Sequence, residues 1–221
     1  MILAVVPSEI EFAQLAPAIE QCGWQGRQIG VGIYDSARGL LAFLEQSVGN
    51  KEQNGGILQQ NISAVLLMGI AGAYPESGLN IGEIVRVDSA LLGDIGARAA
   101  SGEKIPGTQI GASNKKQKSS PLSQAPGVLL EKLTSLASAT SLTVVSATGT
   151  AQEAQERYAQ DAPTIEEMEG CLLALYCEFY KIPFYHVRAI SNMVGPRDLK
   201  SWRMDLALAN LNLWIRGEWH G

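Results

Sequence analysis

Short, continuous apolar runs recur along this chain and alternate with segments of helical periodicity. A run of this kind, bounded by glycine or polar residues, is typical of a strand that is buried on both faces of a sheet. A longer run with alternating polarity also predicts a strand. The predicted strands are residues 2–6, 64–68, 82–92, 142–146 and 184–190.

The segments between these runs predict helices. Ser8 is a candidate N-cap for the first of them, and Pro17 makes its second half uncertain. The strongest helical pattern covers residues 165–179, where apolar side chains recur at three- and four-residue spacing. The predicted helices are residues 9–21, 37–46, 129–136, 151–160, 165–179 and 205–215.

Strands that alternate with helices favour the α/β class. We therefore predict a single domain over residues 1–221, a three-layer αβα sandwich around a mixed, largely parallel sheet. Residues 49–60 are polar and contain glycine, which indicates a loop or a ragged helix end. Residues 101–127 combine Gly, Ser, Pro and Gln with four lysines, and we interpret them as a flexible surface loop, with a lid as the alternative.

Composition excludes several classes of protein. The chain has 221 residues, of which 46% are hydrophobic, enough for one large folded domain. Its formal net charge is −5 and no basic stripe is present, which argues against a nucleic-acid partner. The longest apolar run, residues 64–73, is too short to span a membrane, and residues 1–9 lack the basic flank of a signal peptide.

Cysteine and histidine usage narrows the chemistry. Three cysteines without framework spacing indicate reduced thiols in a cytoplasmic protein, with Cys171 and Cys177 packing a helix. Two histidines, His186 and His220, do not assemble a zinc site, so we expect no metal and no cofactor.

Small or polar residues follow four of the predicted strands. In open α/β sheets, ligands bind at the carboxyl ends of the strands, where small residues let a flat molecule approach the backbone. Any one of these glycines could simply end a strand, but their recurrence at one edge predicts a binding site. The strand ends are Pro7-Ser8-Glu9, Gly69-Ile70-Ala71-Gly72, Ser146-Ala147-Thr148-Gly149 and Ser191-Asn192.

Glu169 is a candidate ligand for a sugar. On the predicted helix it shares a face with apolar Leu172 and Tyr176, where an unpaired carboxylate is costly. Two vicinal ribose hydroxyls would donate to its two oxygens. The neighbouring Glu166 and Glu167 are interpreted only as acids that complement the helix N-terminus.

Glu9 and Glu11 lie just after the first strand, close to the predicted site. Either one could activate a water molecule as a general base. The alternative is that both are solvated acids in the first turn of a helix.

The chain resembles the nucleoside phosphorylase/nucleosidase superfamily over most of its length. Within it, the chain is similar to the futalosine hydrolases of the alternative menaquinone pathway. The superfamily resemblance lies in the carboxylates after the first strand, Gly69-Ile70-Ala71-Gly72, Ile81-Gly82-Glu83-Ile84-Val85, Glu167-Met168-Glu169-Gly170 and Val187-Arg188-Ala189-Ile190-Ser191. The narrower resemblance lies in Leu92-Gly93-Asp94-Ile95-Gly96-Ala97, Ser146-Ala147-Thr148-Gly149-Thr150 and Ser191-Asn192-Met193-Val194-Gly195-Pro196-Arg197-Asp198, with Trp202 beyond.

The resemblance implies a role for each matched residue. Glu169 would hold the ribose hydroxyls with Met168 under the sugar, and Glu11 would activate water, with Glu9 as the alternative. Adenine-cleaving relatives have an aspartate where this chain has Asn192. The implied substrate-binding residues are Ala71, Gly72, Thr148, Met168, Glu169, Ser191, Arg197 and Trp202, and the implied catalytic residues are Glu11, Glu9 and Asn192.

Asn192 bears on the choice of base. A carboxylate would be repelled by a purine 6-oxo oxygen, whereas an amide can donate a hydrogen bond to O6 or N7. Asn192 therefore favours hypoxanthine over adenine as the leaving group. The glutamates after the first strand would repel phosphate, and no arginine accompanies them, so water is the expected nucleophile.

Three arginines of the chain, Arg197, Arg188 and Arg98, bear on the surroundings of the predicted site. Arg197 could pair with the carboxylate of the aromatic tail of futalosine while Trp202 packs on the ring, or it could form an internal ion pair with Asp198 or with a glutamate. Arg188 and His186 are interpreted as structural. Arg98 stands where close relatives would have an acid, which puts any contact from its loop in doubt.

The resemblance thus implies an N-glycosyl hydrolase that cleaves futalosine into hypoxanthine and dehypoxanthine futalosine. The alternatives are a phosphate-dependent 6-oxopurine nucleoside phosphorylase, a methylthioadenosine/S-adenosylhomocysteine nucleosidase and a nucleoside-binding protein without catalysis. The expected partner is a small purine nucleoside, with no nucleic acid and no membrane, and relatives suggest a homo-oligomer.

Overall fold

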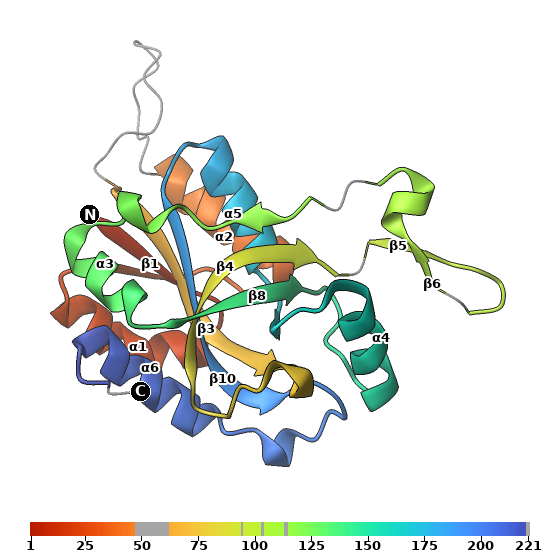
Figure 1. Cartoon of the computed structure of the whole chain (residues 1–221). Helices are drawn as coiled ribbons and strands as arrows, with labels where there is room; N and C mark the ends of the chain where they lie inside the picture. The colour runs from red at the N-terminus through yellow and green to blue at the C-terminus, as the bar shows by residue number, and fades with distance from the viewer. Residues whose placement is uncertain (47–61, 94, 103, 113–114, 220–221) are drawn as a thin grey trace, which may run out of the picture.

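A computed structural model describes residues 1–46, 62–93, 95–102, 104–112 and 115–219 (Figure 1). The strands are β1 (Ile2–Val6), β2 (Gln25–Gln28), β3 (Ala64–Ala73), β4 (Ile84–Leu92), β5 (Gly96–Arg98), β6 (Lys104–Pro106), β7 (Gln117–Lys118), β8 (Ala137–Thr143), β9 (Ile165–Glu167) and β10 (Phe184–Met193). The α-helices are α1 (Glu9–Gln21), α2 (Gly32–Gln46), α3 (Gly127–Thr134), α4 (Ala151–Asp161), α5 (Gly170–Phe179) and α6 (Met204–Arg216). Short 3-10 turns cover Pro75–Ser77, Gly107–Ile110, Leu122–Gln124 and Leu199–Ser201.

Within the described residues, eight strands form one mixed sheet in the order β10-β4-β8-β9-β3-β1-β2, with β7 paired to β4. The pairs β1–β2, β1–β3, β3–β10, β4–β8 and β8–β9 are parallel. The pairs β4–β10, β3–β9 and β4–β7 are antiparallel. Because β10 also pairs with β3, the strands β3, β10, β4, β8 and β9 close on themselves. The prediction of a mixed, largely parallel sheet is confirmed.

Helices cover both faces of this sheet, as the sandwich prediction requires. Alternate residues of the central strands point to opposite faces, so a continuous apolar run supplies both cores. Ala4 and Val6 of β1 pack with α1, α3 and α6, whereas Leu3 and Val5 pack with α2 and α5. In Figure 1, α1 and α6 lie together on one side of the strands, and α2 and α5 lie on the other.

The segment predicted as one helix, residues 165–179, is instead a short strand followed by a helix. Ile165–Glu167 forms β9, which pairs with β8 and β3, and α5 begins only at Gly170. Glu169 is the N-cap of α5, with φ −131° and ψ −35°. The apolar residues of β9 are buried by the sheet, and their spacing happens to continue the helical pattern of α5 towards the N-terminus. The prediction that Glu169 lies on the apolar face of a helix is therefore wrong.

The boundaries of other elements also differ from the predicted ones. The strand predicted at residues 142–146 is β8, which starts at Ala137 and ends at Thr143, because the sheet pairs its polar first half with β4. Strand β3 continues through the predicted strand end at residues 69–72 as far as Ala73. Pro17 does not end α1, which continues to Gln21.

The segment at residues 101–127 is more regular than a plain loop. Its described part contains β6, two 3-10 turns and β7, and β7 joins the main sheet beside β4. The two-stranded β5–β6 sheet projects from the body of the molecule (Figure 1). The loop predicted at residues 49–60 lies outside the described residues. No helix in the described part of the chain is long and apolar enough to cross a bilayer.

Gly39 of α2 offers a test of how tightly this helix packs. A Cβ at this position would lie 2.1 Å from the carbonyl oxygen of Ile29. Helix propensity alone favours alanine over glycine by about 1 kcal/mol. The clash is with backbone and cannot relax by a rotamer change, so we expect Gly39→Ala to lower the free energy of unfolding by about 1–3 kcal/mol in urea titration.

Gly127, the first residue of α3, is the matched control. A Cβ there meets nothing within 4 Å. Gly127→Ala should stay within about 0.5 kcal/mol of the unchanged protein. Equal stability of the two variants would contradict the close packing of α2.

Candidate functional site

A cavity of about 270 Å³ opens at the carboxyl ends of the central strands. It lies between the end of β1, the second half of β3, the segment after β8, the β9–α5 junction and the end of β10. Of the residues predicted for the site, Glu9 alone does not line it, and its side chain is exposed to solvent. The predicted residues that line the cavity are Glu11, Ala71, Gly72, Thr148, Met168, Glu169, Ser191, Asn192, Arg197 and Trp202.

Glu11 is held rigidly at one side of the cavity and is only 4% exposed. It is the third residue of α1, where it forms a capping box with the N-cap Ser8. The Ser8 backbone N–H (3.0 Å) and hydroxyl donate to Oε2, and the N–H of Ile70 donates to Oε1 (2.9 Å). A carboxylate has about four acceptor positions, so this one keeps capacity for a water molecule. The geometry therefore favours Glu11 over Glu9 as a general base.

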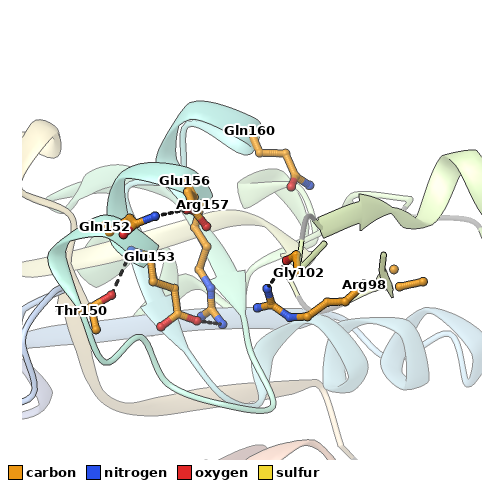
Figure 2. A pocket seen from close by; sticks show the side chains of 10 residues that line it. Arg98, Gly102, Thr150, Gln152, Glu153, Glu156, Arg157 and Gln160 are labelled. Carbon is orange, nitrogen blue, oxygen red and sulfur yellow. Dashed lines mark hydrogen bonds and ion pairs between the residues drawn. The ribbon is translucent and has the colours of Figure 1, made fainter. Parts of the chain in front are cut away.

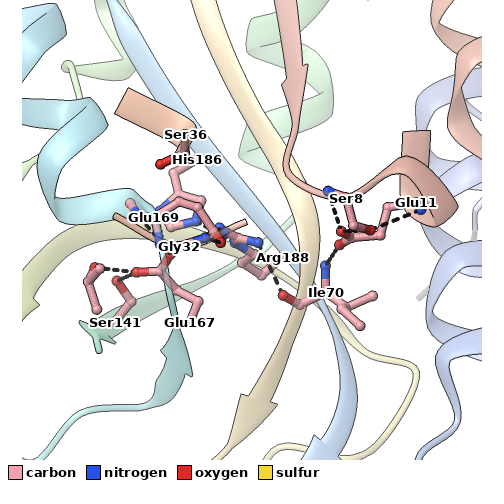
Figure 3. Close-up of polar contacts among 12 residues, drawn as sticks. Ser8, Glu11, Gly32, Ser36, Ile70, Ser141, Glu167, Glu169, His186 and Arg188 are labelled. Atoms are coloured by element: carbon pink, nitrogen blue, oxygen red, sulfur yellow. Dashed lines mark hydrogen bonds and ion pairs between the residues drawn. The ribbon is translucent and has the colours of Figure 1, made fainter. Parts of the chain in front are cut away.

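Glu169 lies across the cavity from Glu11, 3% exposed (Figure 3). Its Oε1 accepts from the N–H of Gly32 at 2.8 Å, and its Oε2 accepts from Nη2 of Arg188 at 2.8 Å. Gly32 is the first residue of α2, so the positive end of that helix faces the carboxylate. Glu169 is buried, as the sequence predicted. However, it is positioned by the N-terminus of α2 and by Arg188, and not by the apolar face of a helix.

Arg188 is the centre of this polar cluster and also lines the cavity. Its Nη2 donates to Glu167 (2.9 Å) as well as to Glu169, its Nε donates to Nε2 of His186 (2.7 Å), and its Nη1 donates to the carbonyl oxygen of Ile70 (3.1 Å). The Ile70 peptide group thus connects Arg188 to Glu11 (Figure 3). These contacts agree with the structural role predicted for Arg188 and show that it positions the carboxylates of the cavity. The sequence signal was a charged residue inside an otherwise apolar strand.

Glu167 has the predicted role at the helix N-terminus and a further role in the polar cluster. It accepts from the N–H groups of Glu169 (2.8 Å) and Gly170 (2.7 Å), so it does meet the N-terminus of α5. It is fully buried as well, where it receives the hydroxyls of Ser141 and Thr143 and pairs with Arg188. The burial of Glu167 and its ion pair with Arg188 were not predicted from the sequence.

Burial and Arg188 set the protonation of the cluster. Burial is the largest influence on the pKa of Glu167 and would raise it, but the charge of Arg188, together with His186 and the hydrogen bonds from Thr143 and the Glu169 N–H, outweighs burial, so the pKa is lowered. For Glu169, burial dominates over Arg188, and the nearby Glu167 adds to it, so the pKa is raised. Burial, with Arg188 next, lowers the pKa of His186 to about 3, so its ring is neutral and accepts from Arg188. The negative charge of the pair thus resides first on Glu167.

Asn192 and Ser191 lie at an irregularity of β10. The register with β3 shifts between Ile190 and Asn192, so Ser191 is an extra residue that β3 does not pair. A bulge of this kind re-aims the side chains next to it. The hydroxyl of Ser191 donates to Oδ1 of Asn192 at 2.7 Å, and Nδ2 of Asn192 donates to the Met193 carbonyl at 3.1 Å.

The remaining predicted residues surround the cavity. The guanidinium of Arg197 lies 5.2 Å from the ring centre of Trp202. The side chain of Asp198 accepts from the backbone N–H of Lys200, and the contact recorded for Arg197 is with Trp202 rather than with Asp198, the alternative partner. Arg98 is exposed on β5, away from this cavity, and donates to the Gly102 carbonyl. In the described part of the chain, no cluster of His, Cys, Asp and Glu could hold a metal ion.

Comparison with known proteins identifies the family. A model of the phosphorylase superfamily matches residues 30–215, most of the chain. The chain belongs to this superfamily. A futalosine hydrolase of Streptomyces coelicolor is 35% identical over 152 residues, which are 66% of this chain and 61% of that protein, so the match spans less than two thirds of the relative's length. A futalosine hydrolase of Thermus thermophilus is 28% identical over 208 residues, 93% of this chain and 85% of the relative.

Solved structures of the superfamily share the fold. A native futalosine hydrolase of Helicobacter pylori has a TM-score of 0.71 at 14% identity, covering 98% of this chain and 94% of its own. A methylthioadenosine/S-adenosylhomocysteine nucleosidase of Colwellia psychrerythraea in complex with adenine has a TM-score of 0.72 at 17% identity, covering 99% and 95%. These likenesses establish the α/β fold of the superfamily.

His186 generates a prediction about acid stability. Its folded pKa of about 3 lies below the unfolded value of 6.5, so the unfolded chain takes up a proton that the folded chain refuses. Stability is therefore fully present above pH 6.5 and is lost as the pH falls from 6.5 towards 3, by up to about 1.4 kcal/mol per pH unit.

His186→Gln keeps an acceptor for Arg188 but does not titrate. Urea unfolding of both proteins between pH 7 and pH 5, above the range of the ordinary carboxyls, should give a shallower slope for the variant. Parallel slopes would show that burial does not keep His186 neutral.

Proposed function

We propose that the chain is a nucleosidase that hydrolyses the N-glycosidic bond of futalosine to release hypoxanthine and dehypoxanthine futalosine, a step of the alternative menaquinone pathway. Membership of the phosphorylase superfamily and the two relatives named futalosine hydrolase support this substrate. The observation that carries the proposal is the orientation of Asn192 in the cavity.

Asn192 presents a donor to the base. The Met193 carbonyl can only accept a hydrogen bond, so its contact with Asn192 supports placing the NH₂ group on that side, with Oδ1 turned towards the Ser191 hydroxyl. One N–H of that group bonds Met193, which leaves the second for a ligand. A purine with oxygen at C6 offers acceptors at both O6 and N7, whereas adenine keeps the N7 acceptor but has a 6-amino donor in place of O6.

The two carboxylates then divide the work on the sugar. Glu11 takes a proton from a water molecule that attacks the anomeric carbon. Glu169 accepts hydrogen bonds from the ribose hydroxyls and stabilises the positive charge that develops on the sugar as the bond breaks. The electrons of the broken bond go to the purine, where the amide of Asn192 donates to N7 or O6.

The charge of the cavity favours water over phosphate as the nucleophile. Arg188 is committed to two carboxylates, a carbonyl and His186. Arg197 is exposed near the mouth, where it stacks on Trp202 and suits the carboxylated aromatic tail of futalosine. The charged residues that line the cavity are Glu11, Glu166, Glu167, Glu169, Arg188 and Arg197.

The proposal also covers the compartment and the oligomeric state of the enzyme. We place it in the cytoplasm as a homo-oligomer. Free thiols at Cys171 and Cys177 support a reducing compartment. Tyr34 of α2 and Phe179 of α5 are 76% and 77% exposed on two helices that pack together, which supports association between copies.

A panel of nucleosides tests the function. Purified protein is incubated with futalosine, inosine and methylthioadenosine, with and without phosphate, and base release is followed by chromatography. We expect futalosine to be cleaved fastest and phosphate to have no effect. Release that requires phosphate would make the protein a phosphorylase, and intact futalosine bound without turnover would make it a binding protein.

Asn192→Asp, assayed with the same nucleosides, tests whether residue 192 distinguishes a 6-oxopurine from a 6-aminopurine. A carboxylate repels the 6-oxo group and accepts from a 6-amino group, so the ratio of kcat/KM for futalosine over methylthioadenosine should fall by about tenfold or more. An unchanged ratio would remove Asn192 from base recognition.

Glu11→Gln and Glu9→Gln separate the two candidate bases. The amide cannot take a proton, so kcat of Glu11→Gln should fall by about 10²–10⁴-fold with little change in KM. Glu9→Gln, a matched change two residues away on the exposed side of α1, should keep kcat within about twofold. The reverse pattern would assign the base to Glu9.

A further inference from the structure

Residues 146–149, which follow β8, form one wall of the cavity and are tied down by charged side chains. Ala147 and Thr148 line the cavity. The segment belongs to no helix or strand, so its backbone groups need other partners. Two buried residues, Glu166 of β9 and Arg157 of α4, supply partners for the Thr148 N–H and the Ser146 carbonyl.

Glu166 holds the middle of this wall. Its Oε1 accepts from the N–H of Thr148 at 2.8 Å, and its Oε2 accepts from the Thr148 hydroxyl at 2.6 Å. Tyr74 and Arg157 also donate to Oε2, at 3.0 Å and 2.9 Å. The helix-terminus role predicted for Glu166 is therefore wrong.

Arg157 holds the wall from the other side. Its guanidinium donates to the Ser146 carbonyl at 3.0 Å and to the Thr148 hydroxyl at 3.1 Å. It also pairs with Glu153, whose second oxygen accepts from the N–H of Gly149 at 3.0 Å. Figure 2 shows Glu153 and Arg157 paired on α4, facing a second, open cavity of about 870 Å³ beside β5.

Residues 146–149 also contact the segment that follows β10 on the other side of the cavity. The Gly149 carbonyl accepts from the N–H of Arg197, in the turn that follows Asn192 along the chain. Residues 146–149, which would contact the base, are therefore joined at Gly149 to the turn that carries Arg197, which would contact the tail. Because its hydroxyl and N–H are both engaged by Glu166, Thr148 has neither donor free for a ligand.

We propose that Glu166 and Arg157 are positioning residues for the base-binding wall, acting through Thr148 and Gly149 rather than by touching the substrate. This inference rests on the proposed function for the identity of the ligand. Glu166 and Arg157 are each 7% exposed and lie between the two cavities, with Glu166 at the edge of the first and Arg157 at the edge of the second. Its loss frees the wall without changing Glu11 or Glu169.

Glu166→Gln is the direct test. An amide has one oxygen for four donors and turns an NH₂ group towards some of them. Hydrogen–deuterium exchange of the free protein should show exchange at Thr148 and Gly149 faster by about tenfold or more. With futalosine, KM should rise about tenfold while kcat stays within about threefold, because the wall binds ground state and transition state alike.

Glu156→Gln is the matched control, since Glu156 lies on the same helix as Arg157 but is exposed and accepts from Gln152 (Figure 2). It should leave the exchange, KM and kcat unchanged. A lower melting temperature for Glu166→Gln with unchanged KM and unchanged local exchange would reduce the pair to a structural role and overturn the proposal.

Thr148→Val covers the case in which Glu166→Gln does not fold. It keeps the shape of the residue and the Glu166–Arg157 pair but removes the hydroxyl that joins them to the wall. KM should rise about threefold with kcat unchanged, and equal KM values would again overturn the proposal. If the unchanged protein cleaves no nucleoside, the proposed function fails, while the exchange measurement still decides whether the pair fixes the wall.

Discussion

The compensation of buried carboxylates by Arg188 is the interaction on which the site depends. Isolated ions in a protein interior cost several kcal/mol each, and removing one partner of a buried pair leaves the other uncompensated. Arg188 meets Glu167 and Glu169 with one nitrogen, and neutral His186 and the Ile70 carbonyl take two of the others. A lysine would bring the charge but not the planar set of donors. The arginine thus allows a buried acid to face a ligand without unfolding the strand ends around it.

The sheet brings this arginine to its partners. Parallel pairing of β10 with β3 aligns Arg188 with Gly69, and a Cβ at Gly69 would lie 2.7 Å from both Arg188 Nη1 and Glu11 Oε1. Only glycine therefore lets the arginine and the glutamate approach the same point of β3. Three residues after Arg188, the bulge at Ser191 turns Asn192 towards the cavity. One strand thus carries both the charge that stabilises the sugar site and the amide that we assign to the base.

Sequence reasoning recovered the class of fold and most of the cavity because both follow from local patterns. Apolar runs such as residues 2–6 and 64–68 identify central strands, and small residues after them identify the ligand edge. It failed at residues 165–169, where burial by a sheet and burial by a helix give the same apolar spacing over a few residues. The partners of Glu166 and Glu167 were also out of reach. Arg157 and Arg188 are nine and twenty-one residues away from them, and only the folded sheet shows that they meet.

The short strand β9 explains why two neighbouring glutamates serve different ends. Successive side chains of a strand point to opposite sides. Glu166 therefore faces Thr148, Tyr74 and Arg157, while Glu167 faces Thr143 and Arg188. Had this segment been helical, the two carboxylates would lie about 100° apart on one cylinder and could not reach ion pairs on opposite sides. Three extended residues thus supply an anchor to each wall of the cavity and deliver Met168 and Glu169 between them. The ion pair of Glu166 with Arg157 lies on the base side of the cavity, and that of Glu167 with Arg188 lies on the sugar side. The two pairs share only backbone, so a change at Glu166 can loosen residues 146–149 while the charges around Arg188 stay balanced.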